Sequence, residues 1–143
     1  MTASSSNRWE HFPHGADIGI RGYGASKAAA FDQAALAMLA IMVDPATVAP
    51  AMEVAICCEA PDDELLLVDW LNALLYEMAT RRVLFSAVQV ELADHELQGT
   101  AWGEAVAPQK HVFGVEVKGA TYTELGVRQL PDGSWLAQCV VDV

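Results

Sequence analysis

The stretch His14-Gly15-Ala16-Asp17-Ile18-Gly19-Ile20 carries an acidic residue at the start of a short apolar strand, with a histidine close by. A second acid stands at the other end of the sequence, in Val140-Val141-Asp142-Val143. If the strands that hold Asp17 and Asp142 are neighbours, two side-chain carboxylates and the terminal carboxylate converge. Three such oxygen donors make a candidate site for a hard divalent cation. The simpler alternative is that each Asp is a solvated or capping residue, as is common in turns.

The chain has 143 residues, of which 53% are hydrophobic and 19% charged, a composition that predicts one globular domain. No apolar run reaches the roughly 20 residues that span a bilayer. The first residues are small and polar, so we expect residues 1–13 to form a flexible tail rather than a secretory signal, and residues 14–143 to form the domain. Cys57, Cys58 and Cys139 match no zinc or redox spacing, which favours buried or half-buried thiols in a reducing cytoplasm.

The balance of charge is strongly acidic: eight Lys and Arg residues face 19 Asp and Glu residues, for a net charge of −11. Nucleic-acid binding draws its affinity from Lys and Arg contacts with phosphate, so we expect no direct tight binding of nucleic acid. An acidic surface accommodates a basic protein partner or a cation more easily.

Hydrophobic periodicity predicts two helices among several strands. Residues 16–23 alternate as a half-buried strand with Asp17 on the polar side. One helix is expected from the Ser26 cap to Asp44-Pro45, and a second from Pro61-Asp62-Asp63 through Met78. The second is apolar around most of its circumference and is expected to be the more deeply buried. The other expected strands are 52–58, 83–92, 97–103, 115–118, 121–129 and 135–141. This order predicts an α+β two-layer sandwich, with two helices packed on one mixed, mostly antiparallel sheet of about six strands.

Motifs of covalent chemistry are absent from the sequence. It contains no dinucleotide-binding or P-loop glycine pattern, no GxSxG elbow and no HExxH pair. No nucleophile has an evident adjacent base, so we expect a protein that is not itself an enzyme. A second concentration of polar residues lies at 109–118, for which an ordinary exposed loop and strand edge is the simpler alternative.

Several ordered motifs resemble those of the archease family, over nearly the whole span from His14 to Val143. Besides the opening stretch, the matching segments are Ala34-Ala35-Leu36-Ala37-Met38, Ile41-Met42-Val43-Asp44-Pro45, Asp69-Trp70-Leu71-Asn72 within Leu65–Tyr76, Lys110-His111, Gly114-Val115-Glu116-Val117-Lys118, Thr121-Tyr122 and Val141-Asp142-Val143. Ordered motifs at compatible spacing are more specific than any one alone. The family usually has Thr where Gly15 stands, which removes a hydroxyl beside Asp17 but not a carboxylate.

The resemblance implies an activator of an RtcB-type RNA ligase, which joins RNA ends bearing a 2′,3′-cyclic phosphate and a 5′-hydroxyl. Such an activator promotes guanylylation of the ligase's active-site His and so restores turnover. The family's metal site falls on Asp17, Asp142 and Val143, the last through a carboxylate or carbonyl oxygen. The expected ion is calcium, magnesium or manganese. A partner surface for the ligase is expected at His14, Lys110, His111, Glu116 and Lys118.

Two other functions remain open from the sequence. One is a chaperone-like or modulator module for tRNA-modifying enzymes such as a tRNA methyltransferase, although the three cysteines do not form the cluster that a redox-switched chaperone requires. The other is a metal-dependent hydrolase, which would need three or more side-chain ligands with an open position. Two Asp residues and a terminus supply fewer.

Overall fold

The structure is a computed structural model that describes residues 7–143. Its elements, in chain order, are β1 (Arg8–His14), β2 (Asp17–Gly24), α1 (Lys27–Met42), the 3-10 turn η2 (Pro45–Thr47), β3 (Met52–Glu59), α2 (Asp63–Arg81), β4 (Val83–Ala93), β5 (Glu96–Ala105), β6 (Gly119–Ala120), β7 (Gly126–Gln129) and β8 (Trp135–Asp142). Both helices begin where capping chemistry predicts. The Ser26 side chain accepts a hydrogen bond from the Ala29 N–H, and that of Asp62 accepts one from the Leu65 N–H.

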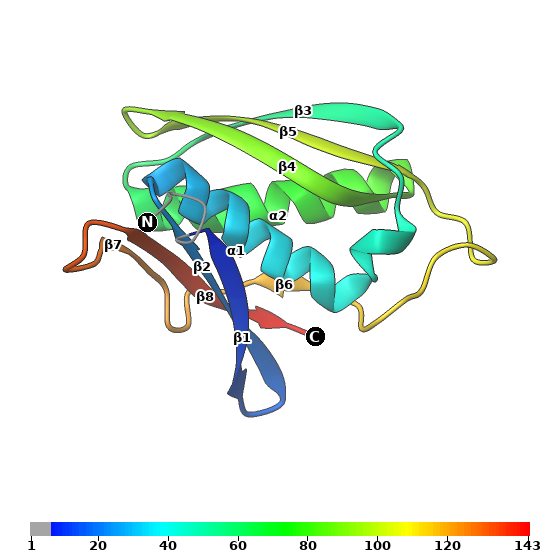
Figure 1. Ribbon diagram of the computed structural model, residues 1–143, viewed down its shortest axis with the longest axis horizontal. Helices are drawn as coiled ribbons and strands as arrows, with labels where there is room; N and C mark the ends of the chain where they lie inside the picture. The colour runs from blue at the N-terminus through cyan, green and yellow to red at the C-terminus, as the bar shows by residue number, and fades with distance from the viewer. Residues whose placement is uncertain (1–6) are drawn as a thin grey trace.

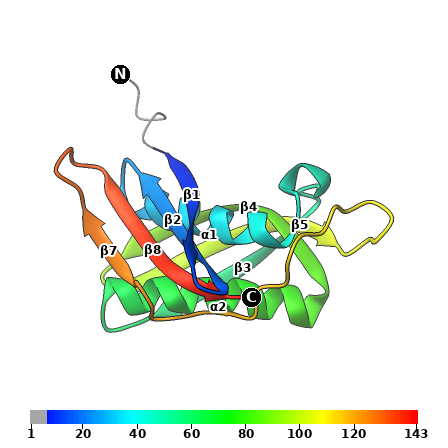
Figure 2. The ribbon, with the colours of Figure 1, turned by 90° about the horizontal axis from the view of Figure 1, so that it is seen from below.

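The predicted α+β class, with two helices packed on antiparallel strands, is confirmed, but the strands form two sheets rather than one. The first sheet has the order β1-β2-β8-β6, with β7 also paired to β8, and the second has the order β3-β5-β4. Every pairing between these strands is antiparallel, so neither sheet is mixed. Figures 1 and 2 show α1 and α2 lying between the two sheets, so the architecture has three layers instead of the expected two.

Small residues let α1 lie directly against β2 of the first sheet. A Cβ added at Gly22 of β2 would lie 2.2 Å from the Ala34 backbone nitrogen, and one at Gly24 would lie 2.5 Å from that of Ala30. Strand and helix therefore approach backbone to backbone.

Eight of the 16 residues of α1 are buried, against seven of the 19 of α2, so the expectation that the second helix is the more deeply buried is wrong.

The expected flexible tail is wrong from residue 8 onward. Strand β1 pairs with β2 along its whole length, from Arg8 opposite Tyr23 to His14 opposite Asp17. The His11 ring contacts the Ala37 carbonyl oxygen of α1 at 2.8 Å, which ties this strand to the core. The domain therefore includes β1, and residues 1–6 of the expected tail lie outside the described residues.

The segment before β8 also differs from expectation. The structure has no strand at 115–118, and the strand expected at 121–129 is reduced to β7, with β6 ahead of it. Backbone groups here bond to other elements instead: the N–H of Val115 donates to the Ile41 carbonyl at the end of α1. No helix among the described residues is long and apolar enough to cross a membrane.

Candidate functional site

The start of β2 and the end of β8 lie side by side. Ile18 pairs with Val141, and one further step of this antiparallel register places Asp17 opposite Asp142. Directly opposed residues of an antiparallel pair project to the same face, here the face that points away from α1. Oδ1 of Asp17 accepts a hydrogen bond from the Val143 N–H at 3.3 Å. The structure thus brings together the three residues that the sequence analysis grouped.

The donors of this cluster have the chemistry of a divalent-cation site. Asp17 is half-buried and Asp142 exposed, and no Lys, Arg or His nitrogen among residues 7–143 pairs with either carboxylate within 4.0 Å. With a main-chain oxygen of Val143 they form an all-oxygen set, which hard cations prefer. No group of three or more His, Cys, Asp or Glu side chains within residues 7–143 is placed to hold a metal. Asp17 and Asp142 thus supply two side-chain carboxylates, fewer than the six to eight oxygen ligands that a bound calcium ion takes.

His14 and Gly15 build the turn that leads into Asp17. His14 is the last residue of β1 and pairs with Asp17, so its exposed side chain shares the face of the carboxylate. Gly15 has a φ of +59°, a conformation that side-chain-bearing residues rarely adopt, and nothing lies within 4 Å of a Cβ added there. Backbone conformation rather than lack of space thus accounts for glycine at this position.

Lys110 and His111 lie in a separate cluster around Glu104, the last but one residue of β5. One Glu104 carboxylate oxygen, Oε2, accepts from the Ala49 N–H at 2.9 Å, from the Lys110 ammonium at 2.6 Å and from the His111 ring at 2.9 Å. The Ala49 N–H makes the largest contribution, followed by Lys110 and His111, and together they hold the pKa of Glu104 at about 2.

His111 itself is only 5% exposed. Its Nδ1 accepts from the Ala107 N–H at 2.9 Å, so Nε2 carries the proton donated to Glu104. The buried His111 ring therefore holds the 106–111 loop through its bond to Ala107. At the surface of this loop the Lys110 side chain is accessible, and the His111 ring is not. Sequence reasoning missed Glu104 because it sits 55 residues from Ala49, outside every motif.

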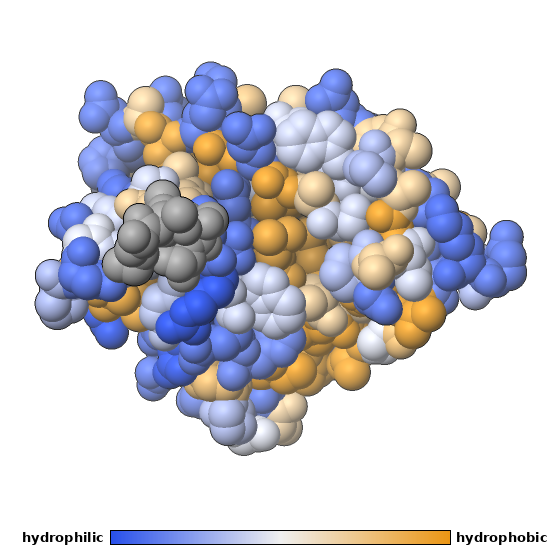
Figure 3. All heavy atoms as spheres, in the orientation of Figure 1, coloured by the Kyte–Doolittle hydropathy of each residue, from blue (hydrophilic) through white to orange (hydrophobic). Residues whose placement is uncertain are grey.

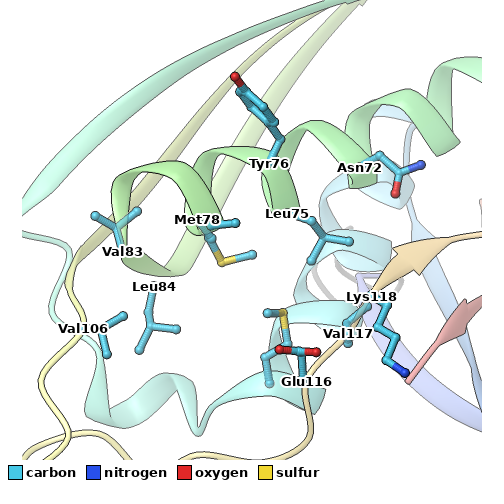
Figure 4. A pocket seen from close by; sticks show the side chains of 12 residues that line it. Asn72, Leu75, Tyr76, Met78, Val83, Leu84, Val106, Glu116, Val117 and Lys118 are labelled. Atoms are coloured by element: carbon cyan, nitrogen blue, oxygen red, sulfur yellow. The ribbon is translucent and has the colours of Figure 1, made fainter.

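Glu116 and Lys118 line a pocket of about 620 Å³ beside the C-terminal half of α2 (Figure 4). The exposed Asn72 of α2 lines it too, and its Oδ1 accepts from the Ala120 N–H at 2.9 Å, so this side chain ties α2 to β6. The Lys118 N–H donates to the Asp142 carbonyl at 2.8 Å. The pocket wall thus continues into the strand end that carries the carboxylates.

The three thiols lie apart from both clusters. Burial raises the pKa of Cys58 to about 11 and that of Cys139 to about 12, which keeps both protonated at neutral pH. Cys57 is exposed, contrary to the expectation of a buried or half-buried thiol.

Comparison with known proteins adds an independent line of evidence. The model of the archease protein family (MTH1598/TM1083) matches residues 9–143. Protein archease of Pyrococcus furiosus is 39% identical over 140 residues, covering 95% of this chain and 99% of the relative. Protein archease of Methanosarcina acetivorans is 34% identical over 145 residues, covering 98% and 99%. The solution structure of Methanobacterium thermoautotrophicum protein 1598 superposes with a TM-score of 0.78 at 32% identity, covering 94% of this chain and 98% of that one. The chain therefore belongs to the archease family.

Proposed function

We propose that this protein activates an RtcB-type RNA ligase, by promoting guanylylation of the ligase's active-site His and hence its turnover. In this proposal a divalent cation, calcium, magnesium or manganese, is held by Asp17, Asp142 and an oxygen of Val143. The protein acts in the cytoplasm as a partner of the ligase and performs no catalysis of its own.

Family membership supports the coarser part of this proposal, an accessory protein of RNA processing. The acidic chain, with a net charge of −11, is suited to a protein partner with a basic surface rather than to RNA itself. Charge steering of this kind speeds encounter with a basic partner.

The observation that carries the metal-dependent part is the placement of Asp17 opposite Asp142, with no Lys, Arg or His nitrogen of residues 7–143 within 4.0 Å of either carboxylate. Two adjacent carboxylates repel one another, and a divalent cation between them removes that repulsion. Such an ion, when bound, neutralises charge on phosphate groups.

The chain's own contribution is to hold the two carboxylates in place. The Val143 N–H bonds to Asp17, and the Lys118 N–H bonds to the Asp142 carbonyl, so the ends of both strands are fixed by backbone groups. A fixed backbone beneath the two carboxylates reduces the ordering cost of binding an ion. His14 and Lys118 flank this face and would meet the partner together with Lys110 and Glu116.

The test is multiple-turnover ligation by the cognate ligase of the same organism, with RNA ends bearing a 2′,3′-cyclic phosphate and a 5′-hydroxyl. We expect the protein to raise turnover, and Asp17→Asn or Asp142→Asn to abolish the increase. Glu91→Gln, on the exposed face of the other sheet, is the matched control and should stimulate normally. A folded protein that leaves an active ligase unchanged would refute the proposal.

A second readout examines the cation directly, without the ligase. Calorimetric titration with calcium, magnesium and manganese should give binding to the unaltered protein and to Glu91→Gln. Binding should be lost in Asp17→Asn and Asp142→Asn. Equal metal binding by all four proteins would remove these carboxylates from the proposed site.

A further inference from the structure

The pocket beside α2 has an apolar floor that no element of the described chain covers. Its aliphatic and thioether side chains come from the end of α1, the C-terminal half of α2, the start of β4 and the 106–118 segment, and they are Met42, Leu75, Met78, Val83, Leu84, Val106 and Val117. Figure 4 shows the labelled apolar side chains around one opening, whereas Tyr76 points away from them on the other side of α2. Two of these side chains are methionines, which adapt readily to the shape of a bound group.

Exposed apolar residues concentrate around this pocket. Seven large hydrophobic side chains are exposed among the described residues, and five belong to the pocket lining or to the segment that forms its wall: Tyr76, Val106, Val112, Phe113 and Val115. The most exposed of these five residues is Tyr76, at 66%. Figure 3 shows apolar surface at the lower right, over the end of α1 and the adjoining 106–118 segment. A local concentration of exposed apolar side chains is typical of interaction sites.

The wall of the pocket is held at several points. The Val112 carbonyl accepts from the Asp44 N–H at 2.8 Å, and the Gly114 N–H donates to the Met42 carbonyl at 2.9 Å. Lys118 is fixed to Asp142 at the other end. A Cβ added at Gly114 would lie 2.2 Å from the Ile41 carbonyl oxygen, so the segment lies directly against the end of α1. The pocket is therefore largely formed before any partner arrives, which limits the ordering cost of binding.

Two charged side chains belong to the pocket lining. Glu116 and Lys118 are the charged residues of the lining, and neither forms an ion pair among residues 7–143. In Figure 4 the Lys118 amine extends toward the end of β8, whereas the Glu116 carboxylate lies among the side chains around the opening. The charge presented to an occupant is therefore negative, in keeping with the net charge of −11.

We propose that this pocket docks an apolar segment of the ligase partner, with a basic residue of that segment paired to Glu116. The inference rests on the proposed function, and it separates two tasks on neighbouring surfaces: the pocket supplies affinity, whereas Asp17 and Asp142 act on the ligase once it is bound. A protein segment suits the site better than a small molecule, because apolar surface at Val112, Phe113 and Val115 extends beyond what a ligand inside the pocket would cover. Apolar anchors in such pockets commonly dominate binding energy.

Ala79→Glu tests whether the apolar lining of the pocket binds the ligase segment. Ala79 lines the pocket and is exposed on α2, so this change places a charge at the opening without disturbing the core. The neighbouring Thr80→Glu is the matched control, since Thr80 is exposed and outside the lining. Measured by calorimetry against the cognate ligase, Ala79→Glu should weaken binding by roughly tenfold or more, with Thr80→Glu near the unaltered value. Equal dissociation constants for both variants would overturn the docking inference.

Glu116→Lys tests the charged part, with Glu91→Lys as a control of equal charge change. We expect Glu116→Lys to weaken binding more than Glu91→Lys, and added salt to reduce the difference between them. Indistinguishable binding of these two variants would remove Glu116 from the contact.

Turnover assays distinguish failure of this inference from failure of the proposed function. At saturating concentration Ala79→Glu should still stimulate the ligase, whereas Asp17→Asn should bind it normally and fail to stimulate. If the unaltered protein neither binds nor stimulates the ligase, the proposed function fails, and the docking inference with it. If it stimulates but Ala79→Glu binds equally well, the docking inference alone fails.

Discussion

The ionised carboxylate of Asp32 on α1 lowers the stability of the fold, because folding partly buries it. Among the described residues its Oδ1 is buried without a hydrogen-bond partner. Burial raises its pKa from 3.8 to about 7, a rise that a hydrogen bond from the backbone of Val90 in β4 offsets only in part. Asp32→Asn keeps the size of the side chain and removes the charge, so we expect this variant to be more stable than the natural protein at neutral and alkaline pH.

The size and sign of the effect follow from proton linkage. A pKa raised from 3.8 to about 7 corresponds to roughly 4 kcal/mol at full strength, since each unit is worth about 1.4 kcal/mol. Asp32 is only half-buried, and solvent screening reduces this to about 2 kcal/mol. Because the pKa is higher in the folded state, stability is greatest below pH 3.8 and falls as pH rises through about 7. The free energy of unfolding of Asp32→Asn should therefore equal that of the natural protein near pH 4 and exceed it by the full amount near pH 8.

Urea unfolding at a series of pH values measures this difference directly. The free energies of unfolding of the natural protein and Asp32→Asn should diverge between pH 4 and 7 and then run parallel. Asp69→Asn, an exposed carboxamide substitution on α2, is the control. A constant difference between Asp32→Asn and the natural protein over the whole range would refute the assignment of the raised pKa to Asp32.

Two further predictions concern close contacts. Gly22→Ala should destabilise the fold by about 3 kcal/mol, because its Cβ would lie 2.2 Å from the Ala34 nitrogen. A thermal melt should show a clear fall in Tm, whereas Gly126→Ala should change Tm little, because its added Cβ lies 3.8 Å from the nearest atom. Equal Tm values for the two variants would contradict this packing of β2 against α1. His111→Ala removes the ring nitrogen that accepts a hydrogen bond from the Ala107 N–H. Amide hydrogen exchange should therefore speed up within residues 106–111, while the helices keep their protection. Unchanged exchange in that loop would show that the His111 ring does not hold it in place.

Local features of the fold were predictable from the sequence because short-range chemistry decides them. Ser26 and Asp62 cap the helices as expected, and the turn at Pro131-Asp132-Gly133 connects β7 to β8. The division into two sheets was not predictable in this way. It depends on which strands pair over long separations and on the Gly22–Ala34 approach, which periodicity within one segment does not reveal.

The 115–118 segment shows how a correct pattern can mislead. Val115 and Val117 alternate with polar residues as a strand would, but their backbone lies against the end of α1 and of β8, so no ladder forms. Nor did the pattern around β1 reveal a strand, because only the pairing with β2 and the bond from His11 to Ala37 give residues 8–13 a fixed place.

The candidate site was predictable in part. The neighbouring strands of Asp17 and Asp142 could be anticipated from two acids at the ends of apolar strands, and the β2–β8 pairing agrees with that placement. The cluster around Glu104 could not, since it joins the Ala49 N–H, Lys110 and His111 through the fold alone. A motif shared with a family identifies Lys110-His111, but only the structure shows that His111 is turned inward.

Formation of the guanylylated ligase from GTP in a single round is the most direct test of the central proposal, that the carboxylates on β2 and β8 promote this step. With the cognate ligase at a fixed concentration, the natural protein and Glu91→Gln should both accelerate formation of the adduct. Asp17→Asn and Asp142→Asn should leave the rate at the level of the ligase alone while still binding it. Acceleration by Asp17→Asn equal to that by the natural protein would contradict the account.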